Sequence, residues 1–222
     1  MNPPPPADFE QRAEFGNVEA NLDFLRRASR LGPGARVLEI GSGRGALLRH
    51  LLREGHDATG VEIDRAAIAA ARDVPIIPVD GPALPFPDES FQLVLSFDVF
   101  EHIPDSDAHL REVARVLAPG GRYLLQTPNK WTNAIFETIR WRSPTAWKVD
   151  HCSLHTFGQL RRRLDRHGFD VRFHDVAVVT DFFRRKLRHY LGPPGSLLLA
   201  MVNPDRLPQR FRTNFYVEAT KR

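Results

Sequence analysis

Three glycines at alternate positions give the first chemical signal of the chain. They stand in Val37-Leu-Glu-Ile-Gly-Ser-Gly-Arg-Gly, between an apolar run at 36–40 that predicts a strand and a helical pattern at 44–53. Glycine lacks a Cβ atom, so the backbone can turn tightly and a ligand can lie against it. The N–H groups at the start of the helix then face that ligand. The loop therefore predicts a site for a nucleotide-like cofactor at the carboxyl ends of the strands.

An acidic residue at the end of the next strand fits the same kind of site. Glu62 follows Gly41 by 21 residues and closes the apolar run at 58–63. A carboxylate in this place can accept both hydroxyl groups of a ribose. Asp64 is a competitor, but its position before a helical run at 65–72 suits an N-cap. These residues alone fit a nicotinamide cofactor and S-adenosylmethionine equally well.

Three further segments separate the two cofactors. They read Asp80-Gly-Pro-Ala-Leu-Pro-Phe-Pro, then Gln92-Leu-Val-Leu-Ser-Phe-Asp-Val-Phe-Glu-His-Ile, then Arg115-Val-Leu-Ala-Pro-Gly-Gly. Together with the glycine loop, they make the chain resemble the class I S-adenosylmethionine-dependent methyltransferases. The resemblance points to the small-molecule branch, which includes quinone and natural-product methyltransferases. It is dense over 36–128 and resumes at His151 and at 164–169.

The resemblance implies a role for each residue around S-adenosylmethionine. The first strand and the glycine loop would surround the methionine part, and Glu62 would hold the ribose. Ile63 would pack on the adenine, and Asp80 would accept its amino group. The residues assigned to the cofactor are Glu39, Gly41, Ser42, Gly43, Gly45, Glu62, Ile63, Asp80, Gly81, Ser96, Phe97 and Asp98. S-adenosylhomocysteine would be the product. Gly45 could instead serve only helix–strand packing, and Asp80 could be a turn residue.

Two histidines are candidate catalytic bases for an oxygen acceptor, which usually loses a proton during methyl transfer. His102 follows the fourth strand, where the family places its acceptor pocket, and His151 stands where related enzymes carry a pocket histidine. Glu101 or Asp150 could orient either ring. The alternative for each histidine is a structural or pocket-lining role.

No metal is expected. The single cysteine, Cys152, excludes a multi-cysteine zinc site, and its neighbours Asp150, His151 and His155 have no recognised ligand spacing.

The acceptor site is expected to lie under residues 128–155 and 180–210. Their aromatic side chains suggest an apolar or ring-containing acceptor, although ordinary core packing explains them equally well. These side chains are Trp131, Phe136, Trp141, Trp147, Phe182, Phe183 and Tyr190.

Strand and helix patterns alternate along most of the 222 residues, which predicts an α/β protein with a parallel sheet covered on both faces. Further strands are expected at 76–79, 91–97, 122–127, 169–179 and 211–220, and further helices at 105–117, 133–140 and 157–167. The resemblance implies a three-layer, Rossmann-like fold whose seven-stranded sheet is mostly parallel, with the last strand antiparallel. We expect one methyltransferase domain over 1–222. It divides into a proline-rich tail at 1–7, a cap helix at 8–31, a cofactor-binding core at 32–128 and acceptor-side elements at 129–210.

Charge is uneven along the chain. Residues 1–139 carry a net charge of −6, and residues 140–222 carry +10. The basic excess is mostly arginine, which could attract an anionic substrate, a membrane surface or nucleic acid, or could be a solvated face. Arg184-Arg-Lys-Leu-Arg-His-Tyr-Leu beside the apolar run at 197–202 could form a basic amphipathic surface for an anionic lipid. No nucleic-acid motif accompanies the charge.

The expected function is methyl transfer to a small-molecule acceptor. Oxygen is the favoured acceptor atom, and nitrogen and carbon are the alternatives. Residues 1–10 lack a basic, apolar leader and no run is long enough to span a bilayer, so a cytoplasmic protein is expected, with membrane association left open. An RNA or protein methyltransferase, a non-catalytic binding module and a nicotinamide oxidoreductase remain as alternatives. The sequence does not indicate an oligomeric state.

Overall fold

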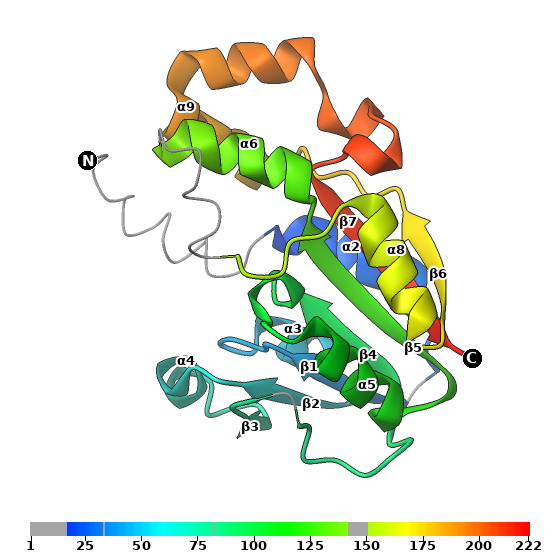
Figure 1. Ribbon diagram of the computed structural model, residues 1–222. Helices are drawn as coiled ribbons and strands as arrows, with labels where there is room; N and C mark the ends of the chain where they lie inside the picture. Colours follow the sequence, from blue (N-terminus) through cyan, green and yellow to red (C-terminus); the bar gives the residue numbers. More distant parts are fainter. Residues whose placement is uncertain (1–16, 33, 82, 142–150) are drawn as a thin grey trace.

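The computed structural model of the chain describes residues 17–32, 34–81, 83–141 and 151–222, and it shows a sheet between two layers of helices (Figure 1). The seven strands lie in the order β3-β2-β1-β4-β5-β7-β6. They are β1 (Arg36–Ile40), β2 (Asp57–Glu62), β3 (Ile76–Pro78), β4 (Phe91–Phe97), β5 (Leu117–Pro128), β6 (Phe169–His174) and β7 (Asn214–Lys221). Strand β7 runs antiparallel to both of its neighbours, β5 and β6, and the other pairings among the described strands are parallel, which confirms the expected fold.

The helices divide between the two faces of the sheet and one edge. They are α2 (Val18–Ala28), α3 (Ala46–Arg53), α4 (Arg65–Ala70), α5 (Ser106–Val116), α6 (Lys130–Trp141), α8 (Phe157–Arg166) and α9 (Asp181–Met201). Short 3-10 turns are η1 (Phe100–His102), η2 (Pro204–Arg206) and η3 (Gln209–Phe211). One core cluster packs α5 and α8 on the sheet, and a second packs α2 and α3 on the other face. Helices α6 and α9 lie beyond the edge at which β5 ends (Figure 1).

The order of the strands determines where a ligand can bind. Strand β1 pairs in parallel with β2 on one side and with β4 on the other. The crossover connections leave this pair of strands in opposite directions, so a crevice opens at the carboxyl ends of β1 and β4. The glycine loop follows β1, Glu62 ends β2, and Phe97 ends β4. These three segments therefore meet at one edge.

The last third of the chain differs from the sequence-based prediction. The expected strand at 169–179 ends at His174, because the backbone N–H groups of Val178 and Val179 donate to the Asp205 carboxylate instead of to a neighbouring strand. The expected strand at 211–220 begins at Asn214, after the turn η3. Between these two strands lies the helix α9, which is kinked at Gly192 and for which the sequence predicted no regular element.

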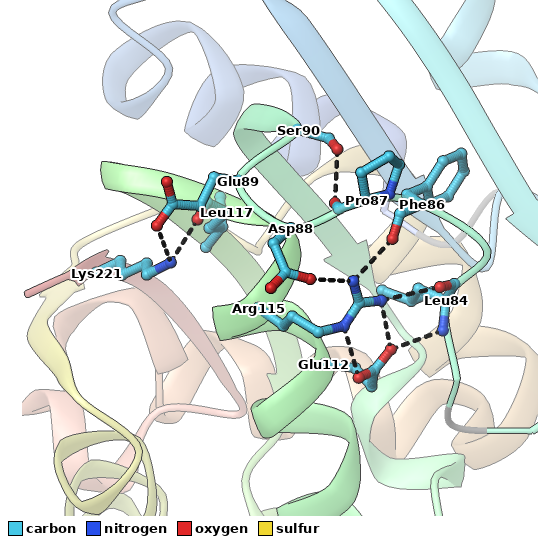
Figure 2. A network of polar contacts seen from close by, with 10 residues as sticks. All are labelled: Leu84, Phe86, Pro87, Asp88, Glu89, Ser90, Glu112, Arg115, Leu117 and Lys221. Atoms are coloured by element: carbon cyan, nitrogen blue, oxygen red, sulfur yellow. Dashed lines mark hydrogen bonds and ion pairs between the residues drawn. The ribbon is translucent and has the colours of Figure 1, made fainter.

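A single arginine ties helix α5 to the loop before β4. All five N–H donors of the Arg115 guanidinium are used: two bind the Glu112 carboxylate, one binds Asp88, and two bind the carbonyl oxygens of Leu84 and Phe86 (Figure 2). The donor–acceptor distances lie between 2.8 and 2.9 Å. The loop also donates the Leu84 N–H to Glu112. The network therefore fixes the loop that follows the expected adenine-binding segment.

Replacing Arg115 by lysine should lower the stability of the protein. A lysine ammonium cannot reproduce the planar fork of five donors, so two or three hydrogen bonds are lost. At a net contribution near 1 kcal/mol each, the free energy of unfolding should fall by about 2 kcal/mol. The melting temperature should fall by roughly 4–8 °C for a chain of this size. The exposed Arg111 on the same helix provides the control, and a melting temperature of R115K equal to that of R111K would contradict this account.

Candidate active site

A cavity of about 1700 Å³ lies at the carboxyl edge of the sheet. Its lining includes the glycine loop, the ends of β2 and β4, the start of α2 and parts of α6 and α9. A pocket for one drug-sized ligand usually measures about 300–1,000 Å³. The cavity can therefore hold a nucleoside-sized cofactor together with a second molecule. The expected cap helix contributes Asn17, Val18, Asn21 and Leu22 to this lining, and residues 1–16 lie outside the described part of the chain.

The glycine loop presents backbone to the cavity. Gly41, Ser42 and Gly43 all line it. Gly43 has a φ of +50°, and nothing lies within 4 Å of where its Cβ would be, so this face of the loop is open to a ligand. Gly45 is not among the lining residues. It caps α3 with a φ of +74°, and a Cβ there would lie 2.5 Å from the Val74 Cγ2 atom, which supports the packing alternative.

Glu62 is held in place by the backbone around it. Its Oε2 atom accepts the Gly43 N–H at 2.7 Å, and its Oε1 atom accepts the Ile63 and Asp64 N–H groups at 2.8 and 2.9 Å. The carboxylate is partly buried at the cavity wall, and Oε2 keeps a lone pair for a ligand hydroxyl. Asp64 caps α4 by accepting the Ala66 N–H at 2.8 Å. The structure thus confirms Asp64 as the N-cap of α4 and places Glu62 at the cavity wall.

Glu39 is a buried acid that faces the cavity with an unused acceptor. Its Oε2 atom has no hydrogen-bond partner among the residues that the structure describes. Burial, and then the negative charge of Glu62, raise the pKa of Glu39 well above its usual range. An unpaired carboxylate is costly in such a place, so a cationic ligand group beside it would be stabilising. The ammonium group of a methionine moiety supplies such a cation.

The expected adenine-binding residues lie on the open side of the cavity. Ile63, Asp80 and Gly81 line it, and Ile63 is 63% exposed. An apolar side chain this open can be covered by a flat ring. The donors, acceptors and apolar surface from Glu39 to Asp80 therefore fit S-adenosylmethionine.

The end of β4 places two of its three predicted residues in the cavity. Phe97 and Asp98 line it, whereas Ser96 is fully buried and is not among the lining residues. Successive side chains of a strand point to opposite faces, so Ser96 and Phe97 diverge. Asp98 follows the strand with a φ of +56°, which breaks the alternation. The structure therefore does not bring Ser96 to the cofactor site.

Asp98 is fixed by a residue that the sequence analysis did not single out. The Asp98 N–H donates to the Gln126 side-chain oxygen at 2.8 Å, and Gln126 also lines the cavity. The Asp98 side chain is exposed toward the cavity but has protein on its other sides. The resulting loss of solvation raises its pKa. Gln126, Lys186 and His102 oppose this rise. A polar side chain at the end of an otherwise apolar strand was the available signal for Gln126.

Both predicted histidines lie together beside a buried acid. The ring centroids of His102 and His151 are 5.0 Å apart, and ligand atoms of both rings and of Glu101 lie within 4.8 Å of one another. The Ser153 N–H donates to the Glu101 carbonyl oxygen at 2.9 Å, which draws the His151 segment toward η1. Asp150, the other expected orienting acid, lies outside the described residues. We call Glu101, His102 and His151 the acid–histidine cluster.

Burial controls the ionisation of Glu101. The side chain is 1% exposed, and its Oε2 atom accepts the Thr127 hydroxyl at 2.9 Å. Burial, and then the negative charge of Asp98, raise the pKa of Glu101 to about 8. An acid titrating near neutral pH beside two imidazoles is typical of a site that moves protons.

The side of the cavity toward α6 and α9 is lined with aromatic groups. Phe136, Phe182, Phe183 and Tyr190 all belong to its lining, and the rings of Phe136 and Tyr190 meet edge to face at 6.1 Å. Trp131 instead lies on the outside of α6 and is 62% exposed, so its expected place at the acceptor is wrong. Trp147 and the Trp141 side chain lie outside what the structure describes.

A third histidine near the cavity makes stability depend on pH. His109 is buried against Phe100, and its Nε2 atom lies 3.1 Å from the Tyr123 hydroxyl. Burial lowers the pKa of His109 to about 4 from an unfolded value near 6.5. The unfolded chain therefore binds more protons between these values, and stability falls as the pH falls through this window.

Unfolding in urea at pH 7.5 and pH 5.0 measures this effect. The contribution of His109 should lower the free energy of unfolding at pH 5.0 by about 2 kcal/mol. His109→Gln cannot titrate, so the same acidification should cost this variant about 2 kcal/mol less. An equal loss in both proteins would contradict the assignment.

Comparison with known proteins identifies the family. A family model described as a methyltransferase domain matches residues 10–174, which is well over half of the chain. The chain therefore belongs to the class I S-adenosylmethionine-dependent methyltransferases.

Its relatives include enzymes of quinone metabolism. The demethylmenaquinone methyltransferase of Mycobacterium tuberculosis (strain ATCC 25618 / H37Rv) is 36% identical over 115 residues, which cover 51% of this chain and 49% of that protein. The ubiquinone biosynthesis O-methyltransferase of Paramagnetospirillum magneticum is 36% identical over 148 residues, or 59% of each. The chain thus spans about half the length of the curated relatives it matches.

A solved structure confirms the fold over nearly the whole chain. It is an S-adenosylmethionine dependent methyltransferase from Mesorhizobium loti, with a TM-score of 0.65 and 21% identity. The alignment covers 91% of this chain and 98% of that one.

Proposed function

We propose that the protein transfers the methyl group of S-adenosylmethionine to an oxygen atom of a small, apolar or ring-containing acceptor. The observation that carries this proposal is the continuity of the cavity, which runs from Glu39 and the glycine loop, past Asp98, to the acid–histidine cluster and the aromatic side chains of α6 and α9. Its volume leaves room for an acceptor next to the cofactor. The names of the two quinone methyltransferases are consistent with a ring-shaped acceptor.

The residues divide into those that hold the cofactor and those that prepare the acceptor. S-adenosylmethionine supplies, when bound, a methyl group activated by a positively charged sulfur. Glu39 would accept hydrogen bonds from its ammonium group, Glu62 from a ribose hydroxyl and Asp80 from the adenine amino group. Aligning the acceptor atom with the methyl group and the sulfur of the cofactor accounts for a large part of the rate enhancement in such a displacement.

The acid–histidine cluster would take up the proton of the acceptor hydroxyl. Imidazole is the usual side-chain proton acceptor in such reactions, and His102 and His151 both line the cavity. Glu101 lies beside both rings, and the imidazolium that forms favours the ionised carboxylate. The apolar side chains of α6 and α9 would exclude water from this step. An oxygen nucleophile thus becomes available where the methyl group is delivered.

A methyl-transfer assay tests this proposal. The full chain is incubated with S-adenosylmethionine carrying a deuterated methyl group and, separately, with a dihydroxylated aromatic compound, a hydroquinone, an aromatic amine, bulk RNA and a protein mixture. Mass spectrometry should find the label on an oxygen of the hydroxylated aromatic acceptors. Label on RNA or protein alone, or no transfer to any acceptor, would contradict the proposal. The assay is repeated after dialysis against EDTA, and a loss of transfer would show that the reaction requires a cation.

A further inference from the structure

One side of helix α6 carries large apolar side chains on the outside of the molecule. Trp131, Ile135 and Ile139 follow one another at intervals of four residues and therefore share a helix face. They are 62%, 61% and 51% exposed. Single exposed apolar residues are common on protein surfaces, but a contiguous row over three turns is not. The row indicates a surface that is covered in use.

A second row lies at the end of helix α9. Leu197, Met201 and Val202 are 65%, 75% and 46% exposed. The kink at Gly192, followed by Pro193 and Pro194, changes the direction of the helix, and its second half is drawn above α6 in Figure 1. The two exposed rows therefore belong to one end of the molecule.

Members of both rows border the cavity. Ile135 and Ile139 of α6 line the cavity and are exposed at the same time, as is Val202 after α9. Phe211, which is 49% exposed, also lines it. Side chains that are both open to solvent and part of the lining mark its rim. We call the rows on α6 and α9, with this rim, the apolar end surface.

Basic side chains accompany the apolar end surface. Arg184, Arg185 and Arg188 are exposed on the first half of α9, and none of them forms an ion pair with a residue that the structure describes. Arg206 and Arg210 are exposed on the turns that follow the apolar row. Residues 181–210 carry six basic and two acidic residues. The helix and turns that carry the second apolar row therefore also carry a net positive charge.

We propose that the apolar end surface docks onto an anionic phospholipid membrane. Apolar side chains beside arginines bind such an interface by two additive contributions, burial among acyl chains and attraction to lipid phosphates. No helix of the described chain is long and apolar enough to cross a bilayer, so docking would leave the protein on the surface. The part of the cavity rim that Ile135, Ile139 and Val202 form would then face the lipid. The docking proposal rests on the proposed function and makes it more specific: the methyl acceptor is lipid-soluble and enters the cavity from the membrane.

Vesicle co-sedimentation of the full chain, without cofactor, tests the docking. The vesicles contain phosphatidylcholine alone or with 30% phosphatidylglycerol, in 0.1 M and 0.5 M salt. One variant removes the apolar contribution by W131S, L197S and M201S, none of which lines the cavity. A second removes charge by R184Q, R185Q and R188Q. A matched control, R111Q, R161Q and R162Q, removes the same charge from exposed positions on α5 and α8.

The wild-type chain should sediment with the anionic vesicles and not with the neutral ones. The arginine variant should lose about 100-fold in partitioning, since each charge near the surface contributes about fivefold. The apolar variant should lose at least tenfold, and the control should bind like the wild type. Higher salt should weaken but not abolish binding.

Other results would overturn the docking proposal. Equal losses of vesicle binding in the control and in the arginine variant would mean that the overall charge of the protein, and not the arginines of α9, attracts it to the membrane. If the wild-type chain is a dimer and the W131S, L197S and M201S variant is a monomer, a second copy of the chain covers the surface. If the chain binds RNA but not vesicles, the partner is a nucleic acid. Binding of S-adenosylhomocysteine in solution should be unchanged in all variants. Vesicle binding without methyl transfer would therefore refute only the proposed function, and methyl transfer without vesicle binding only the docking.

Discussion

Replacing Glu62 by alanine is expected to weaken the binding of S-adenosylhomocysteine by about 10- to 100-fold. The substitution removes a charge-assisted hydrogen bond to the ribose, which contributes about 1.5–3 kcal/mol. It also removes the acceptor of the Gly43 N–H and so loosens the glycine loop. Titration calorimetry measures the dissociation constant, and the melting temperature without ligand shows whether the fold is retained.

A neighbouring acid provides the control for Glu62. Asp64→Ser keeps an N-cap for α4, and Asp64 is not among the residues that line the cavity. Its dissociation constant should match that of the wild type. Equal affinity in E62A and wild type would refute the ribose assignment, and a loss in D64S of the same size would mean that local charge, not the Glu62 contact, matters.

Replacing His102 or His151 by glutamine should lower kcat by about 100- to 10,000-fold for a hydroxylated acceptor. This is the usual contribution of a positioned proton acceptor. The rings are 5.0 Å apart and share Glu101, so we expect them to act as a unit. The double variant should then be about as slow as the slower single variant. Single-turnover rates at saturating cofactor measure the effect.

The affinity for S-adenosylhomocysteine separates a proton-transfer role from a structural one. It should stay within about twofold of the wild type in both histidine variants. His189→Gln, at an exposed position on α9, should leave kcat unchanged. If the two single losses multiply in the double variant, or if both variants retain full kcat, the shared proton-transfer role is excluded.

The cofactor half of the site is visible in the sequence because local signals build it. The strand β1, the glycine loop and the start of α3 are consecutive, and Glu62 ends the next strand in the chain. Parallel pairing of β1 with β2 then brings Glu62 to the loop, as the contact between its carboxylate and the Gly43 N–H shows. Ser96 departs from the expectation because its side chain points to the face of β4 opposite to that of Phe97. Gly45 departs from it because Val74 occupies the space beside its Cα atom.

The acceptor half depends on tertiary contacts that no local pattern shows. His102 and His151 come together through a backbone hydrogen bond between Ser153 and Glu101, which are far apart in the sequence. Trp131 was expected among the aromatic side chains at the acceptor. It is 62% exposed, whereas Phe136, on a different side of α6, lines the cavity and contacts Tyr190 of α9. Helical periodicity indicates that a face is apolar, but not what covers it.

We expect this cavity to bind S-adenosylmethionine. Thermal unfolding with S-adenosylmethionine, S-adenosylhomocysteine and NAD in parallel tests it most directly. At about 100 times the dissociation constant, a ligand adds about 2.7 kcal/mol to the stability of the folded state. The melting temperature should rise by roughly 5–10 °C with each adenosyl ligand and should not change with NAD. A rise with NAD alone, or with none of the three, would contradict the account.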